Sequence, residues 1–236
     1  MAWTPFSLAG PVGAALDTEA VHYGPGLPTE EALRLLGRVS GKRVLELGCG
    51  SGACAVALAR AGARVIAVDA DAGNIDDTRD RAEREAVRVE THHGPPADLA
   101  FVRADSVDAA LSTYGLAAVT DLDRVFRQVH RVLRPDRPFV FSLPHPAFLM
   151  LDPAAEEPVL RRTWWDPSPV RWGSTAGEGD RPVTMASLVG SLVRAGFGID
   201  AVVEPPSDPT AAGDAWSDVL RWVPATLVVR ARKVGA

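Results

Sequence analysis

Two carboxylates and three glycines in the first third of the chain have the types and spacing needed to hold a nucleotide-like ligand. Glu46 stands two residues before Gly48, and further glycines follow at positions 50 and 52. Glycine lets the backbone turn sharply and approach a ligand without a Cβ in the way. A carboxylate at Glu46 suits a ligand ammonium and repels a pyrophosphate. Asp69 ends the next apolar run, where a ribose-binding site needs an acidic residue.

These residues need a strand, a tight turn and a helix to hold them in place. Val44, Leu45 and Leu47 form a short apolar run that predicts a buried strand of a parallel sheet. The Ala- and Leu-rich segment 53–60 predicts a helix whose free N–H groups point back at the turn. Residues 63–69 predict a second strand. Strand, glycine turn and helix are the nucleotide-binding start of a doubly wound α/β fold.

The combined pattern resembles the class I S-adenosylmethionine (SAM) dependent methyltransferases. Their first motif is similar to Val44–Gly52 of this chain, and their second to Val65–Asp69. The resemblance covers most of the chain. It implies a Rossmann-like, doubly wound α/β fold: a seven-stranded, mostly parallel sheet with one antiparallel late strand and helices on both faces. It also implies SAM as cofactor and S-adenosyl-L-homocysteine (SAH) as product.

The resemblance implies a cofactor site on the first two strands and the loops that follow them. Asp69 is expected to hold the ribose hydroxyls, and Asn74 to touch the adenine. Asp98 either accepts the exocyclic amine of adenine while the Leu99 N–H meets a ring nitrogen, or caps a short turn. Many relatives carry an aspartate three positions earlier, where this chain has Pro95. The full set expected at the cofactor is Tyr23, Glu46, Gly48, Cys49, Gly50, Gly52, Asp69, Ala70, Asn74, Asp98, Leu99 and Ser112.

A histidine between two prolines is the candidate catalytic residue. His145 follows the predicted strand 138–143, and Pro144 and Pro146 hold its backbone extended. A histidine there could take a proton from an acceptor hydroxyl, or it could bond a loop carbonyl. The tryptophans of the following insertion either close over an apolar acceptor or form a satellite core. The residues expected at the acceptor are Tyr114, His145, Trp164, Trp165 and Trp172.

Length and patterning predict one domain over residues 1–236. An amphipathic helix is expected at 29–36. The resemblance implies that residues 1–40 form an N-terminal lid over the cofactor; the alternative is a helix that merely packs on the edge of the sheet. The segment 147–182 is too long for a plain connector. The insertion 147–183 is therefore expected to cap the acceptor pocket.

Composition restricts the partners. The net charge of −5 leaves no overall cationic footprint for nucleic acid. Cys49 and Cys54 show no metal-ligand spacing and are expected to be reduced thiols. The chain shows no signal peptide and no apolar run long enough to span a membrane. We therefore expect a cytoplasmic protein, a monomer or homodimer, that needs no metal and acts on a small molecule.

The sequence predicts methyl transfer from SAM to that small molecule. Oxygen is the expected acceptor atom, with nitrogen or carbon left open, and bacterial secondary metabolism or quinone pathways are the expected setting. Two other classes stay open. Gly48, Gly50 and Ala53 also satisfy a dinucleotide fingerprint, but an NAD(P)-linked oxidoreductase would need a catalytic pair such as Tyr-x-x-x-Lys, which the chain lacks. A SAM-binding protein without turnover would show the same motifs.

Overall fold

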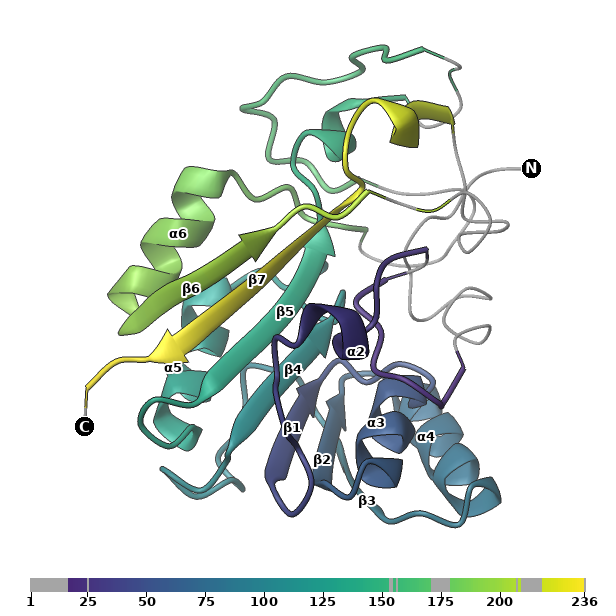
Figure 1. Cartoon of the computed structure of the whole chain (residues 1–236). Helices are drawn as coiled ribbons and strands as arrows, with labels where there is room; N and C mark the ends of the chain where they lie inside the picture. The colour runs from purple at the N-terminus through teal and green to yellow at the C-terminus, as the bar shows by residue number, and fades with distance from the viewer. Residues whose placement is uncertain are drawn as a thin grey trace.

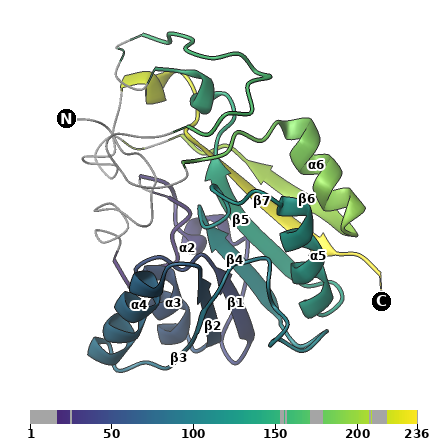
Figure 2. The same ribbon diagram turned by 180° about the vertical axis from the view of Figure 1, so that it is seen from behind.

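The described residues form a seven-stranded sheet with helices on both faces (Figures 1 and 2). The computed structural model describes residues 17–24, 26–152, 155, 157–170, 179–206, 208 and 218–235. The strand order is β3-β2-β1-β4-β5-β7-β6, and β7 runs antiparallel to both β5 and β6. The predicted mostly parallel sheet with one antiparallel late strand is confirmed.

The elements follow the hydrophobic pattern of the sequence closely. The strands are β1 (Arg43–Leu47), β2 (Arg64–Asp69), β3 (Val89–His93), β4 (Ala109–Thr113), β5 (Pro138–Pro144), β6 (Phe197–Val203) and β7 (Thr226–Lys233). The helices are α2 (Glu30–Leu33), α3 (Ala53–Arg60), α4 (Ala72–Arg84), α5 (Leu122–Val132) and α6 (Met185–Arg194), with short 3-10 turns η1 (Phe148–Met150) and η3 (Asp218–Arg221).

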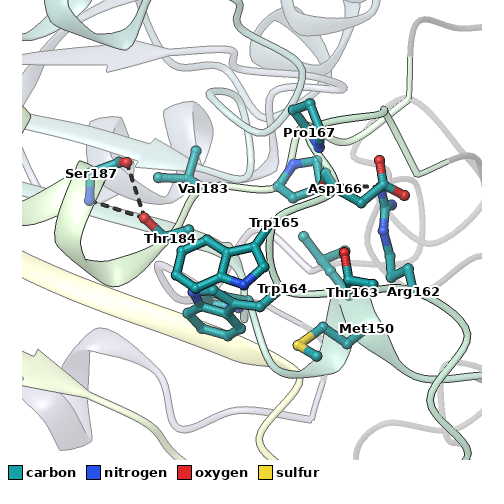
Figure 3. A pocket seen from close by; sticks show the side chains of 13 residues that line it. Met150, Arg162, Thr163, Trp164, Trp165, Asp166, Pro167, Val183, Thr184 and Ser187 are labelled. Atoms are coloured by element: carbon teal, nitrogen blue, oxygen red, sulfur yellow. Dashed lines mark hydrogen bonds and ion pairs between the residues drawn. The ribbon is translucent and has the colours of Figure 1, made fainter.

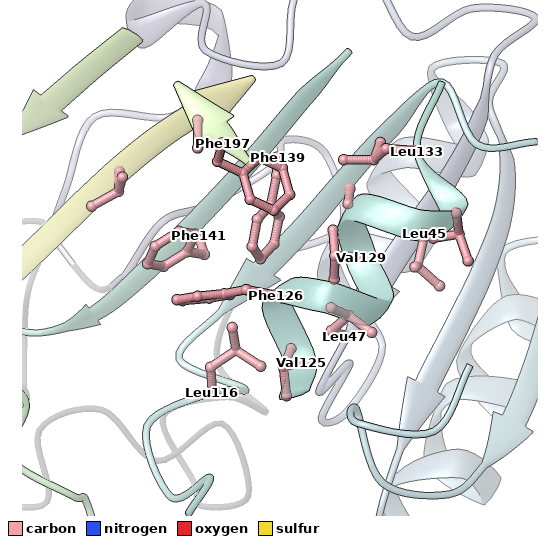
Figure 4. Packing of buried hydrophobic residues seen from close by; sticks show 14 of the residues in the cluster. Leu45, Leu47, Leu116, Val125, Phe126, Val129, Leu133, Phe139, Phe141 and Phe197 are labelled. Atoms are coloured by element: carbon pink, nitrogen blue, oxygen red, sulfur yellow. The ribbon is translucent and has the colours of Figure 1, made fainter. Parts of the chain in front are cut away.

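The sheet separates two hydrophobic cores. The core under α5 and α6 is built around aromatic rings, with Phe126 of α5 lying against Phe139 and Phe141 of β5 (Figure 4). The ring centroids of Phe126 and Phe141 are 5.6 Å apart, and those of Phe139 and Phe141 are 4.9 Å apart. Such tilted aromatic pairs contribute beyond the area that they bury. The rings fix how α5 sits on the centre of the sheet.

The second core lies under α3 and α4. The N-terminal segment 21–36 contributes buried residues to it. Leu35 and Leu36 of this segment pack with Val140 of β5 and Val228 of β7. The helix expected at 29–36 is only four residues long, because Arg34 adopts a left-handed conformation with φ of 52°. The sequence prediction was therefore right in type and too long by one turn.

Glu30 explains how the chain turns after this short helix. Its carboxylate accepts the backbone N–H groups of Leu35, Leu36 and Gly37 at 2.8–2.9 Å. These N–H groups lie beyond the end of the helix and would otherwise lack partners. One side chain thereby fixes the turn that follows the helix.

The carboxyl ends of β1, β2, β4 and β5 meet at one edge of the sheet, and the segment after β5 lies above it (Figure 1). This is the edge at which open parallel sheets bind ligands. No helix among the described residues is long and apolar enough to cross a membrane.

Two loops at this edge touch through their backbones. The turn after β1 and the loop after β4 approach so closely that a Cβ on Gly115 would lie 2.6 Å from Gly48 Cα and 2.8 Å from Gly48 O. Gly48 also has φ of +67°, which disfavours other residues. Both positions therefore require glycine for packing within the protein, before any ligand is considered.

We expect Gly115→Ala to lower the free energy of unfolding by about 1–3 kcal/mol, the usual cost of overpacking. The added Cβ would meet backbone atoms, which cannot rotate away. Gly94→Ala is the matched control, because nothing lies within 4 Å of a Cβ at Gly94. Urea unfolding of both variants measures the difference. Equal stability of the two variants would show that the loops separate at little cost.

Candidate functional site

The glycine turn between β1 and α3 is held by backbone hydrogen bonds to the end of β2. The N–H groups of Gly48 and Cys49 donate to Val68 O at 2.7 and 3.2 Å. A Cβ on Gly52 would lie 2.7–2.9 Å from Thr78 of α4. Thr78 Oγ1 also donates to Gly50 O at 3.1 Å. The turn is thus fixed between β2 and α4 in one conformation.

Asp69 joins this turn to the start of α4. One carboxylate oxygen accepts the Gly50 N–H at 2.9 Å, and the other accepts Asp71 N–H at 2.9 Å and Asn74 Nδ2 at 3.1 Å. Asp69 is buried at the carboxyl end of β2. The Asp69 carboxylate therefore lies beside the glycine turn, as the sequence predicts. Its hydrogen bonds join the turn after β1 to the loop between β2 and α4.

Glu46 is a buried carboxylate whose charge is not balanced by its neighbours. It is 2% exposed, and its Oε2 has no hydrogen-bond partner among the described residues. Burial first, and the negative charge of Asp69 second, raise the pKa of Glu46 well above its usual value. An unpaired buried carboxylate is costly unless a cation or a proton compensates it. The site suits a ligand that brings a positive charge.

The residues expected near an adenine lie in two neighbouring loops, after β2 and after β3. Ala70 is exposed, and its carbonyl lies 3.1 Å from His93 Nε2. Asp98 is exposed and accepts the Ala100 N–H at 3.3 Å, which is the turn-capping alternative. Leu99 is fully buried. The turn role of Asp98 does not occupy its second carboxylate oxygen in any described bond.

Three of the predicted ligand contacts are buried, and their hydroxyl groups bond to other parts of the protein. Ser112 is fully buried and donates to Leu47 O at 2.7 Å, so it ties β4 to β1. Tyr23 is fully buried, and its hydroxyl donates to Glu30. Tyr114 is 5% exposed, and its hydroxyl pairs with Thr226 of β7. Each side chain satisfies a buried polar group of the fold.

The two cysteines are buried free thiols. Burial raises the pKa of both Cys49 and Cys54, so both stay protonated near neutral pH. Cys49 Sγ lies 3.4 Å from Thr78 Oγ1, inside the turn. Cys49 contributes to the site through its backbone. Among the described residues, no group of three or more His, Cys, Asp or Glu is placed to hold a metal ion.

His145 lies at the end of β5 with both ring nitrogens engaged. Ala147 N–H donates to Nδ1 at 3.1 Å, and Nε2 lies 2.9 Å from Glu204 Oε1. Because Nδ1 accepts, the ring proton is on Nε2 and is donated to the carboxylate. The side chain joins the exit of β5 to the exit of β6. Neither nitrogen is free to accept a proton from another molecule in this arrangement.

Two of the three predicted tryptophans come together beyond the end of β5. Trp164 and Trp165 line a cavity with Met150 and Val183 (Figure 3). Trp172 lies outside the described residues. The first turn of α6 forms another part of the wall of this cavity.

Sequence reasoning missed three contributors to this edge. Gly115 packs on the glycine turn, Thr78 holds the turn from α4, and Glu204 bonds His145. The sequence offers a signal only for Gly115, which directly follows a predicted strand end. Thr78 and Glu204 lie in segments whose local pattern shows only a helix and a strand end.

Comparison with known proteins finds similarity to methyltransferases. A family model described as a methyltransferase domain matches residues 44–136. Ubiquinone biosynthesis O-methyltransferase from Azorhizobium caulinodans is 28% identical over 87% of this chain and 76% of that protein. Demethylmenaquinone methyltransferase from Clavibacter sepedonicus is 36% identical over 43% of this chain, which spans only 41% of that protein.

A solved structure extends the comparison to the whole fold. The SAM-dependent methyltransferase from Mesorhizobium loti has a TM-score of 0.69 and 26% sequence identity, covering 86% of this chain and 96% of that one. The residues present also fit SAM, because its amino-acid end supplies the positive charge that the buried Glu46 carboxylate lacks. Together these matches support a class I SAM-dependent methyltransferase.

Proposed function

We propose that this enzyme transfers the methyl group of SAM to an oxygen atom of a small molecule. The observation that carries the proposal is the buried Glu46 carboxylate beside the glycine turn, whose Oε2 has no hydrogen-bond partner among the described residues. The relative that matches most of the chain is an O-methyltransferase of ubiquinone biosynthesis, which supports oxygen as the acceptor atom. A setting in secondary metabolism or quinone pathways is part of this proposal.

In the proposed site, Glu46 binds the ammonium of the methionine end. Asp69 accepts the ribose hydroxyls. A carboxylate offers about four lone pairs, and three protein donors already use this one. A second ribose hydroxyl must therefore displace one of them. The Asn74 side chain is the contact that can rotate away, because the other two donors are backbone groups. Asn74 is then free to turn toward the adenine.

The bound SAM would supply an activated methyl on a sulfonium. The chain would hold donor and acceptor collinear and close, which is enough for such a displacement. His145 could act as a general base only after Nδ1 releases the Ala147 N–H, because Nε2 carries the ring proton. We therefore infer that His145 positions the edge of the acceptor pocket and that catalysis rests on alignment.

The two lid-like segments belong to the proposal as well. We infer a single domain in which the described part of residues 1–40 covers the cofactor and the described part of residues 147–183 caps the acceptor. Residues 1–16 and 171–178 of these two segments lie outside the described residues. The packing of 21–36 on the second core and the position of 147–152 above β5 support this. The free thiols of Cys49 and Cys54 support a reducing, cytoplasmic setting. The enzyme would work there as a monomer or homodimer.

The enzyme assay compares SAH formation with and without a panel of phenols, amines and carbon acids. We expect acceptor-dependent SAH formation with phenolic acceptors. Calorimetric titration with SAM, SAH and NAD runs alongside it. Binding of NAD in place of SAM would support an oxidoreductase, and SAM binding without SAH formation on any acceptor would indicate a binding protein without turnover.

We expect Asp69→Ala to weaken SAM binding at least tenfold. A hydrogen bond to a charged group contributes about 1.5–3 kcal/mol, and tenfold is about 1.4 kcal/mol. Thr78→Val is the matched control. It removes a hydroxyl that supports the same turn without facing the ligand. Calorimetry measures both. Equal losses in the two variants would mean that Asp69 acts through the turn.

We expect the affinity for SAM to rise as the pH increases from the acidic range toward neutral. The raised pKa of Glu46 means that the free enzyme carries a proton there at low pH, and the ligand ammonium needs the deprotonated form. Above this range the α-amino group of SAM itself loses its charge, since such groups have a pKa of about 7.7–8.0.

Glu46→Gln should bind SAM more weakly and lose this pH dependence, because a neutral amide replaces the carboxyl group at nearly the same size. Adenosine, which has no ammonium, should bind the variant and the unchanged enzyme equally. A pH profile that persists in the variant would place the titrating group elsewhere.

A further inference from the structure

The cavity beyond β5 is large enough for a ligand and is not part of the proposed cofactor site. Its volume is about 250 Å³, and its walls come from η1, the segment 162–167 and the first turn of α6 (Figure 3). A cavity of roughly 150 Å³ holds a benzene molecule. By that measure, the cavity accommodates a molecule of one or two rings.

The walls are aromatic and apolar. Trp164, Trp165, Leu149, Met150 and Val183 are among the residues that line it. The side chain of Trp165 is on the rim, and the residue is 81% exposed. Because so much of this indole is exposed, covering it with a flat apolar ligand would bury apolar surface and favour binding.

The charges at one end of the cavity cancel each other. Arg162 NH2 lies 2.9 Å from Asp166 Oδ2 and also donates to the carbonyls of Asp166 and Ser168. The Ser168 N–H donates to Asp166 at 2.9 Å and, with Arg162, lowers the pKa of Asp166. The pair therefore stays ionised and mutually neutralised. A charged ligand would lose its hydration here without finding an opposite free charge.

The other end offers one hydrogen-bond donor. Thr184 Oγ1 accepts the Ser187 N–H at 3.1 Å and donates to Ser187 Oγ at 3.0 Å. These bonds leave the Ser187 hydroxyl proton unused by any described residue. In Figure 3 this pair and the Arg162–Asp166 pair lie on opposite sides of the indole rings. The donor suits an oxygen substituent on a ligand ring.

The cavity lies beside the methyl-transfer edge. Pro146 and Val183 line it and also line a smaller cavity that reaches Leu116. Leu116 follows Gly115, which packs on the glycine turn. The shared residues show that the two cavities are neighbours, and the smaller one reaches the loop that borders the cofactor site.

We propose that the cavity binds the ring system of the methyl acceptor, and that this acceptor is an uncharged one- or two-ring aromatic molecule with an oxygen substituent facing Ser187. The inference rests on the proposed O-methyl transfer. In that step a ring hydroxyl oxygen forms the new C–O bond. The methyl–sulfur bond breaks with its electron pair left on sulfur, and the hydroxyl proton leaves to water.

The first test is calorimetric titration of the full chain with 1-naphthol and with 1-naphthalenesulfonate, which has the same rings and a negative charge. We expect 1-naphthol to bind at least tenfold more tightly than the sulfonate. Trp165→Ala should weaken 1-naphthol binding at least tenfold. Trp222→Ala is the matched control, because Trp222 is 63% exposed and lies outside this cavity. Equal binding of the two probes, or no loss in Trp165→Ala, would overturn the proposal.

A second variant tests the charge argument. Asp166→Asn leaves Arg162 without its counter-charge, so the sulfonate should gain affinity at least tenfold relative to 1-naphthol. A purely structural loss would weaken both probes together and would count against the cavity. SAM affinity is measured in each variant and should not change. If the protein without substitutions binds SAM but not 1-naphthol, the proposed acceptor cavity is wrong and the proposed function stands. If that protein does not bind SAM, the proposed function itself is wrong.

Discussion

The structure depends on the way one turn is held between its neighbours. The glycine turn after β1 bonds Val68 O, the Asp69 carboxylate and Thr78, and it packs on Gly115 from the loop after β4. These contacts come from β2, α4 and β4, so the turn takes its shape only when the sheet order is correct. The same contacts bring the Glu46 and Asp69 carboxylates together at one edge. The cofactor site is therefore a direct consequence of closing the sheet.

Electrostatics at this edge favours a particular kind of ligand. Burial and the nearby Asp69 raise the pKa of Glu46, so the free protein stores an unfavourable charge or a proton there. A ligand with an ammonium and ribose hydroxyls relieves that penalty, whereas a pyrophosphate would add to it. The glycine spacing alone also fits a dinucleotide. The negative charge of the Glu46 carboxylate disfavours a pyrophosphate at this edge and favours a ligand with an ammonium.

The two halves of the site are built differently. The cofactor half comes from consecutive strand, turn and helix units, which hold their residues by short-range hydrogen bonds. The proposed acceptor half comes from the segment after β5, whose described residues contain one short 3-10 turn, η1, before α6. It is held by contacts such as His145 with Glu204 and Arg162 with Asp166. A variable loop on a rigid edge lets one fold serve many acceptors.

The sequence by itself determined the order and type of the elements, because each depends on periodicity and turn residues within a few positions. It also placed Glu46 and Asp69, since both end apolar strands. Only the tertiary structure decided where side chains of distant segments point. Ser112 bonds Leu47 across 65 residues and His145 bonds Glu204 across 59, and no local pattern encodes either pair. Tyr23 and Tyr114 turned inward for the same reason: buried hydroxyls need partners, and the fold supplied Glu30 and Thr226.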